Sequence, residues 1–110
     1  MLKRTVLIML LSAGAGGVAE ATDKLSVNLA GVGSDSCAYW LSNQDHKSEG
    51  TVWIFGFWSG LNYVAAASDQ DQSKATSANM IATVETTCKH DPSSSLASAA
   101  WSAYIDLNRR

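Results

Sequence analysis

The hydrophobic pattern of the chain is clearest over residues 51–67, a run without a charged side chain. Apolar residues recur there at intervals of three or four, which predicts a helix, because strict alternation of polar and apolar residues fails. Gly56 and Gly60 share one side of this helix, where each costs about 1 kcal/mol relative to alanine. We therefore expect another helix, or a bulky ring, to cross at this pair. The expected buried stripe consists of Trp53, Phe57, Leu61 and Val64, with Ile54, Trp58 and Ala65 beside it.

Shorter patterns on the N-terminal side predict one more helix and an arm. Ser34 or Asp35 can cap a short helix that carries Cys37. The polar residues 42–50 are expected to form a loop between this helix and the long one. Residues 22–33 are expected to form an extended arm, because no second strand pattern accompanies their weak alternation.

Two helices are expected in the C-terminal third. Over about residues 77–90, apolar side chains recur at helical spacing, and Cys88 lies on their stripe. Asp91-Pro92 is typical of a helix start, with Asp91 as the cap, and the apolar face of the last helix runs over residues 96–107. The predicted fold is all-α: a small orthogonal bundle of about four helices over residues 34–110, held by one disulfide.

The first residues carry the pattern of an export signal. Lys3 and Arg4 precede an apolar run, and small residues then lead to Ala19-Glu20-Ala21. A positive start, a short apolar run and an A-x-A site predict a signal peptide over residues 1–21, cleaved before Thr22. We therefore expect a periplasmic protein. No membrane span is expected after cleavage, because residues 51–67 are at the short limit for one and include polar residues.

Charge and size narrow the class of protein. The whole chain has 8 Lys and Arg against 10 Asp and Glu, and removing Lys3, Arg4 and Glu20 leaves 6 against 9, a formal charge of −3. A mildly acidic chain without a basic patch argues against nucleic acid as a partner. The mature length suits one small domain of marginal stability, which benefits from a covalent link.

Cys37 and Cys88 provide such a link. An even number of cysteines in an exported chain predicts a disulfide. Its loop of about 50 residues corresponds to about 4 kcal/mol in the chain-entropy description. A redox pair, or a metal site with His46 and His90, is the weaker alternative, because the spacing matches neither C-x-x-C nor a zinc pattern. We expect no metal and no other cofactor.

Catalytic patterns are weak in this sequence. GFWSG, residues 56–60, differs from a nucleophile elbow, because Ser59 is its fourth residue and lies in a predicted helix. His46 follows Asp45, and His90 precedes Asp91. Because neighbours in sequence do not point at each other, neither pair predicts a catalytic site. Paired carboxylates and phosphate-binding loops are missing from the sequence. We therefore expect no enzymatic activity.

The segment MIATVETTCKHDPSSSLASAAWSAYIDL resembles the C-terminal half of the HdeA/HdeB-type family of small periplasmic helical proteins. In that pattern a helix ends on a cysteine, and a short polar loop leads to the final helix. Cys37 corresponds to the family's other half-cystine, and the resemblance covers roughly residues 36–107. It implies an acid-stress chaperone, a homodimer at neutral pH that opens in acid and covers unfolded periplasmic clients.

The charges are compatible with that function. When the nine carboxylates are protonated and the two histidines are charged, the formal charge of the mature chain moves from −3 to +8, and like-charge repulsion then opposes compact states. The disulfide would limit unfolding. Under the resemblance, the client or dimer surface is expected at Trp53, Phe55, Phe57 and Trp58.

A different class of function remains open. Small exported, disulfide-linked helical proteins also include immunity proteins of the Rap1a/Tai type, which bind and block one toxic effector. Such a protein needs an exposed patch that complements its effector. The acidic segments 43–50 and 68–74 are the candidates, because they could attract a basic partner.

Overall fold

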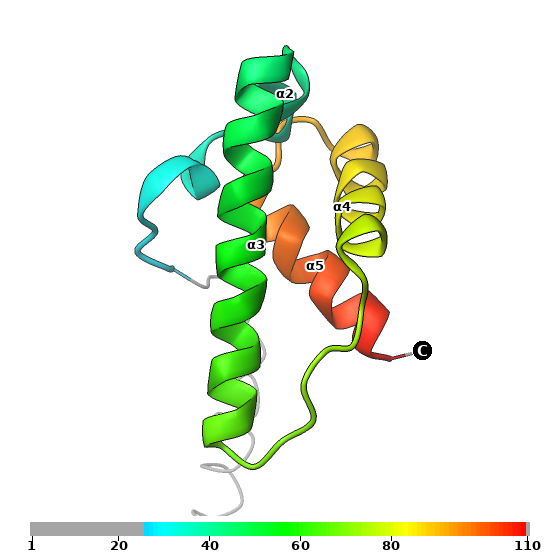
Figure 1. Ribbon diagram of the computed structural model, residues 1–110. Helices are drawn as coiled ribbons and strands as arrows, with labels where there is room; N and C mark the ends of the chain where they lie inside the picture. The colour runs from blue at the N-terminus through cyan, green and yellow to red at the C-terminus, as the bar shows by residue number, and fades with distance from the viewer. Residues whose placement is uncertain (1–25, 110) are drawn as a thin grey trace, which may run out of the picture.

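A short 3₁₀-helix and four α-helices occupy residues 26–109, the part of the chain that the computed structural model describes (Figure 1). Figure 1 shows α3 as the long central helix, with the N-terminal arm on the left and α4 and α5 on the right. The all-α fold with four α-helices is confirmed, whereas the expected signal peptide lies outside the described residues. The elements are η1 (Gly31–Ser34), α2 (Cys37–Leu41), α3 (Gln44–Ala67), α4 (Ser77–His90) and α5 (Leu96–Asn108).

Each α-helix begins in the same way. The residue before it has an extended backbone, and its side-chain oxygen accepts a hydrogen bond from the backbone N–H three residues later. This bond satisfies one of the N–H groups that the first turn of a helix leaves without a partner. The four caps are Ser36, Asn43, Thr76 and Ser95.

The predicted starts of α2 and α5 are therefore wrong. Ser36 caps α2 in place of Ser34 or Asp35, and Ser95 caps α5 in place of Asp91. The two true caps also meet across an isolated antiparallel bridge. Here the Cys37 N–H donates to the Ser94 carbonyl at 2.7 Å, and the Leu96 N–H donates to the Asp35 carbonyl at 2.8 Å. The start of α2 is thus tied to the start of α5.

The predicted loop over residues 42–50 is also wrong, because α3 begins at Gln44. The Asn43 side chain starts the helix, and the exposed polar residues that follow face solvent. The opposite side packs on α2: Gly50 is buried, and a methyl group there would overlap the ring of Trp40. Trp40 Nε1 also donates to the Lys47 carbonyl at 2.9 Å. These contacts make the first turns of α3 part of the core.

The buried side of α3 is displaced by one residue from the prediction. Ile54, Trp58 and Ala65 are the buried residues, whereas Val64 is 60% exposed. The reason is that α5 packs on this side and offers small residues, so that the bulky Trp58 ring fits beneath it and meets Tyr104 edge to face, with 5.2 Å between ring centroids. The small buried residues of α5 are Ala97, Ala99, Ala100 and Ala103.

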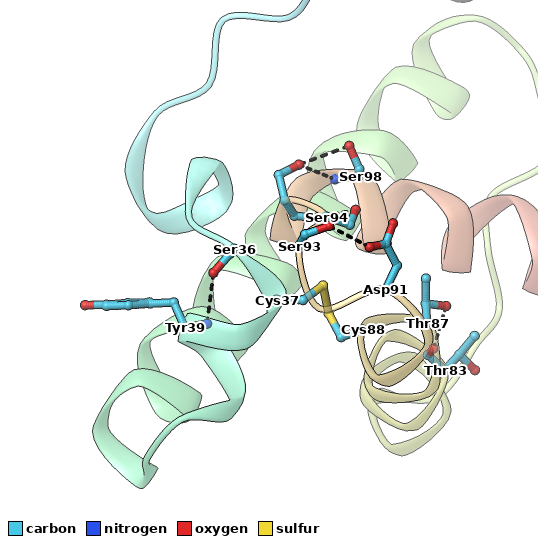
Figure 2. Close-up of a disulfide and its surroundings, with 11 residues drawn as sticks. Ser36, Cys37, Tyr39, Thr83, Thr87, Cys88, Asp91, Ser93, Ser94 and Ser98 are labelled. Carbon is cyan, nitrogen blue, oxygen red and sulfur yellow. Dashed lines mark hydrogen bonds between the residues drawn. A yellow bond between two sulfur atoms is a disulfide. The ribbon is translucent and has the colours of Figure 1, made fainter.

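The disulfide joins Cys37, the first residue of α2, to Cys88 near the end of α4 (Figure 2). Both cysteines are fully buried, and they are 51 residues apart in the sequence. The predicted pairing is confirmed. A loop of this length corresponds to a stabilisation of about 4 kcal/mol in the chain-entropy description.

The expected crossing at Gly56 and Gly60 is not present within the domain. A Cβ atom at either glycine would have no neighbour within 4 Å in the described part of the chain. The close approaches occur at Gly50, under Trp40, and at Gly33, under Trp53. The glycines that pack are therefore not the pair that the helical spacing singled out.

Candidate functional site

An apolar groove of about 490 Å³ lies between the N-terminal arm, α3 and α5. Among the described residues no charged side chain lines it, and its polar lining groups are two serine hydroxyls and the indole N–H of a tryptophan. Apolar grooves of this size are typical binding sites for small apolar ligands or for side chains of another protein. The lining residues are Val27 and Leu29 on the arm, Phe57 and Leu61 on α3, and Ser95, Ala97, Ser98 and Trp101 on α5.

The groove remains open to solvent on the arm and on α5. Val27 is 59% exposed and Trp101 is 45% exposed, although both are large apolar residues. The Trp101 ring stacks on Tyr104 with 6.0 Å between centroids, and Tyr104 in turn contacts the buried Trp58. The exposed ring of the groove thus rests on the core.

Trp53 holds the arm that forms one wall of the groove. Its Nε1 donates to the Ala30 carbonyl at 2.8 Å. The next turn of the arm lies directly on the indole: Gly31 has a left-handed backbone with φ of 78°, and a methyl group on Gly33 would overlap the ring. On its other side, Trp53 stacks on Phe57 at 5.1 Å. One indole therefore links the arm to the groove.

The four aromatic residues expected to form one client or dimer surface have three different surroundings. Trp53 and Phe57 belong to the arm and the groove. Phe55 is 36% exposed on another side of α3. Trp58 is 1% exposed, and its Nε1 donates to Ser73 Oγ at 3.0 Å, so it belongs to the core of the folded chain.

Sequence reasoning missed the other half of the groove. Val27 and Leu29 alternate with polar residues in the arm, and this alternation was the available signal. Trp101 lies at the edge of the apolar face of the last helix, where an exposed ring is expected. Neither pattern reveals that the arm folds back against α5, because that placement depends on Trp53.

The described residues contain no group of three or more His, Cys, Asp or Glu side chains that could hold a metal ion. His46 Nδ1 lies 2.9 Å from Ser42 Oγ, and its ring stacks on Tyr39. Ser59 lies exposed in the middle of α3, away from any strand-to-helix turn. Neither His46 nor Ser59 is among the residues that line the groove.

One ion pair connects two helices next to the core. Lys47 on α3 pairs with Glu85 on α4, and both side chains are partly buried. The Lys47 ammonium also lies 4.9 Å from the centre of the Trp40 ring. Among the described residues no charged side chain is buried in the core, so this partly buried pair lies at its margin, beside Trp40.

In the part of the chain that the structure describes, none of the helices has the length and hydropathy needed to cross a membrane. Comparison of the chain with protein-family models, with curated proteins and with solved structures found no match.

Proposed function

We propose that this protein is an exported chaperone of the HdeA/HdeB-like kind, which binds apolar segments of unfolded periplasmic proteins. The observation that supports the proposal is the open apolar groove. Its volume of about 490 Å³ accommodates several side chains of a client, and their burial there releases water from both surfaces. The described lining residues carry no charge, which suits clients of varied sequence, because no charge has to be matched.

The charges supply the response to acid. In acid the carboxylates of the chain lose their negative charge as a class while lysine and arginine keep their positive charge, so like-charge repulsion opposes the compact state. The disulfide continues to hold α2 to α4. The net positive charge of the acidified chain keeps complexes with clients apart in solution. Acid therefore loosens the domain while the covalent link limits unfolding.

An aggregation assay tests this function. The purified protein is expected to suppress the aggregation of an acid-denatured client at pH 2–3. Trp101→Ala removes the exposed ring of the groove and is expected to reduce the protection severalfold. Tyr39→Ala is the matched control, because Tyr39 is an aromatic residue of similar exposure on α2, outside the groove. Absence of protection by the unchanged protein at pH 2–3 would contradict the proposal.

The second candidate is an immunity protein of the Rap1a/Tai type, and one observation favours it. Residues 70–76 remain irregular, and a second hollow of about 540 Å³ lies between them and the end of α5. Asp71 and Lys74 line this hollow, so it presents charges of both signs to a partner. The other candidate segment, residues 43–50, is mostly helix and offers no loop. A protein of this kind binds one purified effector tightly at pH 7 and gives no protection in acid.

A further inference from the structure

The polar groups that line the groove all lie at the start of α5. Ser95, Ser98 and Trp101 follow one another at intervals of three residues, so they share one side of the helix. The other lining residues are apolar, and the least exposed of them form what we call the floor of the groove. The floor consists of Phe57, Leu61 and Ala97. The groove therefore combines an apolar floor with one polar edge.

One hydroxyl hydrogen of the polar edge has no acceptor among the described residues. Ser95 Oγ and Ser98 Oγ lie 3.0 Å apart and share one hydrogen bond (Figure 2). Ser95 Oγ also accepts a hydrogen bond from the Ser98 backbone N–H at 3.1 Å. Two hydroxyls bring two hydrogens, and only one of them is used, whichever hydroxyl donates. The other hydrogen is available to a ligand.

The indole N–H of Trp101 is a second free donor. No described residue accepts a hydrogen bond from it, whereas the indole N–H groups of Trp40, Trp53 and Trp58 all have acceptors within the chain. The Trp101 ring is 45% exposed, so its N–H can be offered to a ligand. The polar edge thus has two donors to give.

The ligand that fits this edge brings acceptors and few donors. Among the described lining residues the only side-chain acceptors are the two serine hydroxyl oxygens, and none of the lining side chains is charged. A peptide backbone placed in the groove would lose water from its N–H groups without finding acceptors, which is costly. An acyl chain carries no donor along its length and has its acceptor oxygens at one end. The groove therefore suits an acyl chain better than a peptide backbone.

We propose that the groove binds a single-chain acyl compound, a fatty acid or its ester. The chain lies on the apolar floor, and the carbonyl oxygens accept hydrogen bonds from Trp101 Nε1 and from the free hydroxyl of the Ser95–Ser98 pair. The proposal goes beyond the chaperone function and does not rest on it, because the folded protein at pH 7 already has this groove.

The size of the groove fits such a ligand. Its volume of about 490 Å³ lies within the range of about 300–1,000 Å³ that is usual for small-molecule sites. Burial of one methylene group tightens binding roughly fourfold. Affinity is therefore expected to rise with chain length until the floor is covered.

Isothermal titration calorimetry at pH 7 tests the apolar part of the site. Octanoate, decanoate and dodecanoate are expected to bind with affinities that rise about tenfold from one to the next. Monodecanoylglycerol is expected to bind as well, and the tighter of the two decanoyl compounds identifies the free acid or the ester as the source. Absence of binding by every acyl compound, or affinity that does not depend on chain length, would overturn the proposal.

Decyltrimethylammonium tests the polar edge. It has a chain of similar length but no acceptor. The net charge of the chain is −2, so general electrostatic attraction favours this cation over decanoate. The two donors favour decanoate, which is expected to bind at least tenfold more tightly. Equal or tighter binding of the cation would contradict the assignment of the edge.

Trp101→Phe removes the indole N–H and keeps an aromatic ring in the groove. Loss of one hydrogen bond is expected to weaken decanoate binding about fivefold. Tyr39→Phe is the matched control, because it removes a polar hydrogen from an exposed ring outside the groove, and it is expected to bind decanoate unchanged. Equal affinity of the two variants would overturn the role of Trp101.

The two uses of the groove can fail separately. A protein that binds no acyl compound at pH 7 but still protects clients in acid would refute the acyl site alone. A protein that binds decanoate at pH 7 but gives no protection at pH 2–3 would support the acyl site and refute the chaperone function.

Discussion

Gly33 lies flat against the indole of Trp53, so closely that a single methyl group at this position would overlap the ring. The contact fixes the N-terminal arm across α3, and with it one wall of the groove. Gly31 precedes it with a left-handed backbone, which lets the arm turn over the ring. The arm is thus positioned by one aromatic side chain, and its stability can be tested at one residue.

Gly33→Ala is expected to displace the arm. Forcing a methyl group into this contact costs about 1–3 kcal/mol, and the hydrogen bond from Trp53 Nε1 to the Ala30 carbonyl is lost with it. Urea unfolding measures the stability, and deuterium exchange over residues 26–34 reports on the arm. Gly60→Ala is the matched control, because a Cβ atom at this position meets open space. This substitution is expected to stabilise the protein by up to about 1 kcal/mol, since alanine favours a helix more than glycine does. Unchanged exchange in Gly33→Ala would contradict this account.

Removal of the disulfide is expected to be the most destabilising change of this set. Replacing Cys37 and Cys88 together by alanine should cost about 2–5 kcal/mol in the free energy of unfolding. Chemical denaturation of the double variant at pH 7 measures the loss. The reductant-treated unchanged protein should give the same value within error. A loss below 1 kcal/mol in the double variant and in the reduced protein would contradict this expectation. It would mean that the hydrogen bonds of Ser94 and Leu96, which join the starts of α2 and α5, already hold this region together.

The ion pair between Lys47 and Glu85 is expected to stabilise the contact between α3 and α4. A double-mutant cycle with Lys47→Met and Glu85→Gln should give a coupling of about 1 kcal/mol at pH 7, because both side chains are partly buried. Urea unfolding of the four proteins at pH 7 provides the measurement. A coupling of zero would show that the pair does not help to hold α3 against α4.

Asn43→Ala is expected to fray the first turns of α3. The Asn43 side chain accepts a hydrogen bond from the His46 N–H at 2.8 Å, and losing such a cap costs about 1 kcal/mol. Amide exchange over residues 44–50 should accelerate more than exchange at the centre of the helix. Gln44→Ala is the control, because this exposed side chain contacts only Ser48 among the hydrogen bonds of the described residues. Equal exchange in both variants would show that packing under Trp40 is enough to hold the turns.

The fold was predictable where local pattern and packing agree. The stripe that carries Cys88 and the small residues of the last helix predicted α4 and the body of α5 from spacing, and the even number of cysteines predicted the disulfide. The start of α3 was not predictable, because residues 44–49 are polar and only Gly50 reveals that Trp40 packs there. The buried stripe was displaced by one residue because α5 packs on the side that carries Ile54 and Trp58, while Trp53, which belongs to the predicted stripe by spacing, holds the arm. The role of each glycine depends on which ring lies over it, and that is a tertiary relationship.

The candidate site was predictable only in part for the same reason. Phe57 was among the expected surface aromatics and lines the groove, whereas Trp58, its neighbour in sequence, points into the core. On a helix, adjacent residues differ by about 100° in direction, so a cluster in sequence does not make a cluster in space. The partners of Phe57 across the groove come from both ends of the chain.

The Cys37–Cys88 bond divides the protein into a covalent ring and two tails. The ring contains α2, α3 and α4, and the tails are the N-terminal arm and the segment that carries α5. The groove lies where both tails meet on the ring. Neither tail is closed into the covalent circle, so the arm and α5 are held on the ring by packing and hydrogen bonds alone. The protein thus combines a covalently constrained frame with two groove walls that depend on noncovalent contacts.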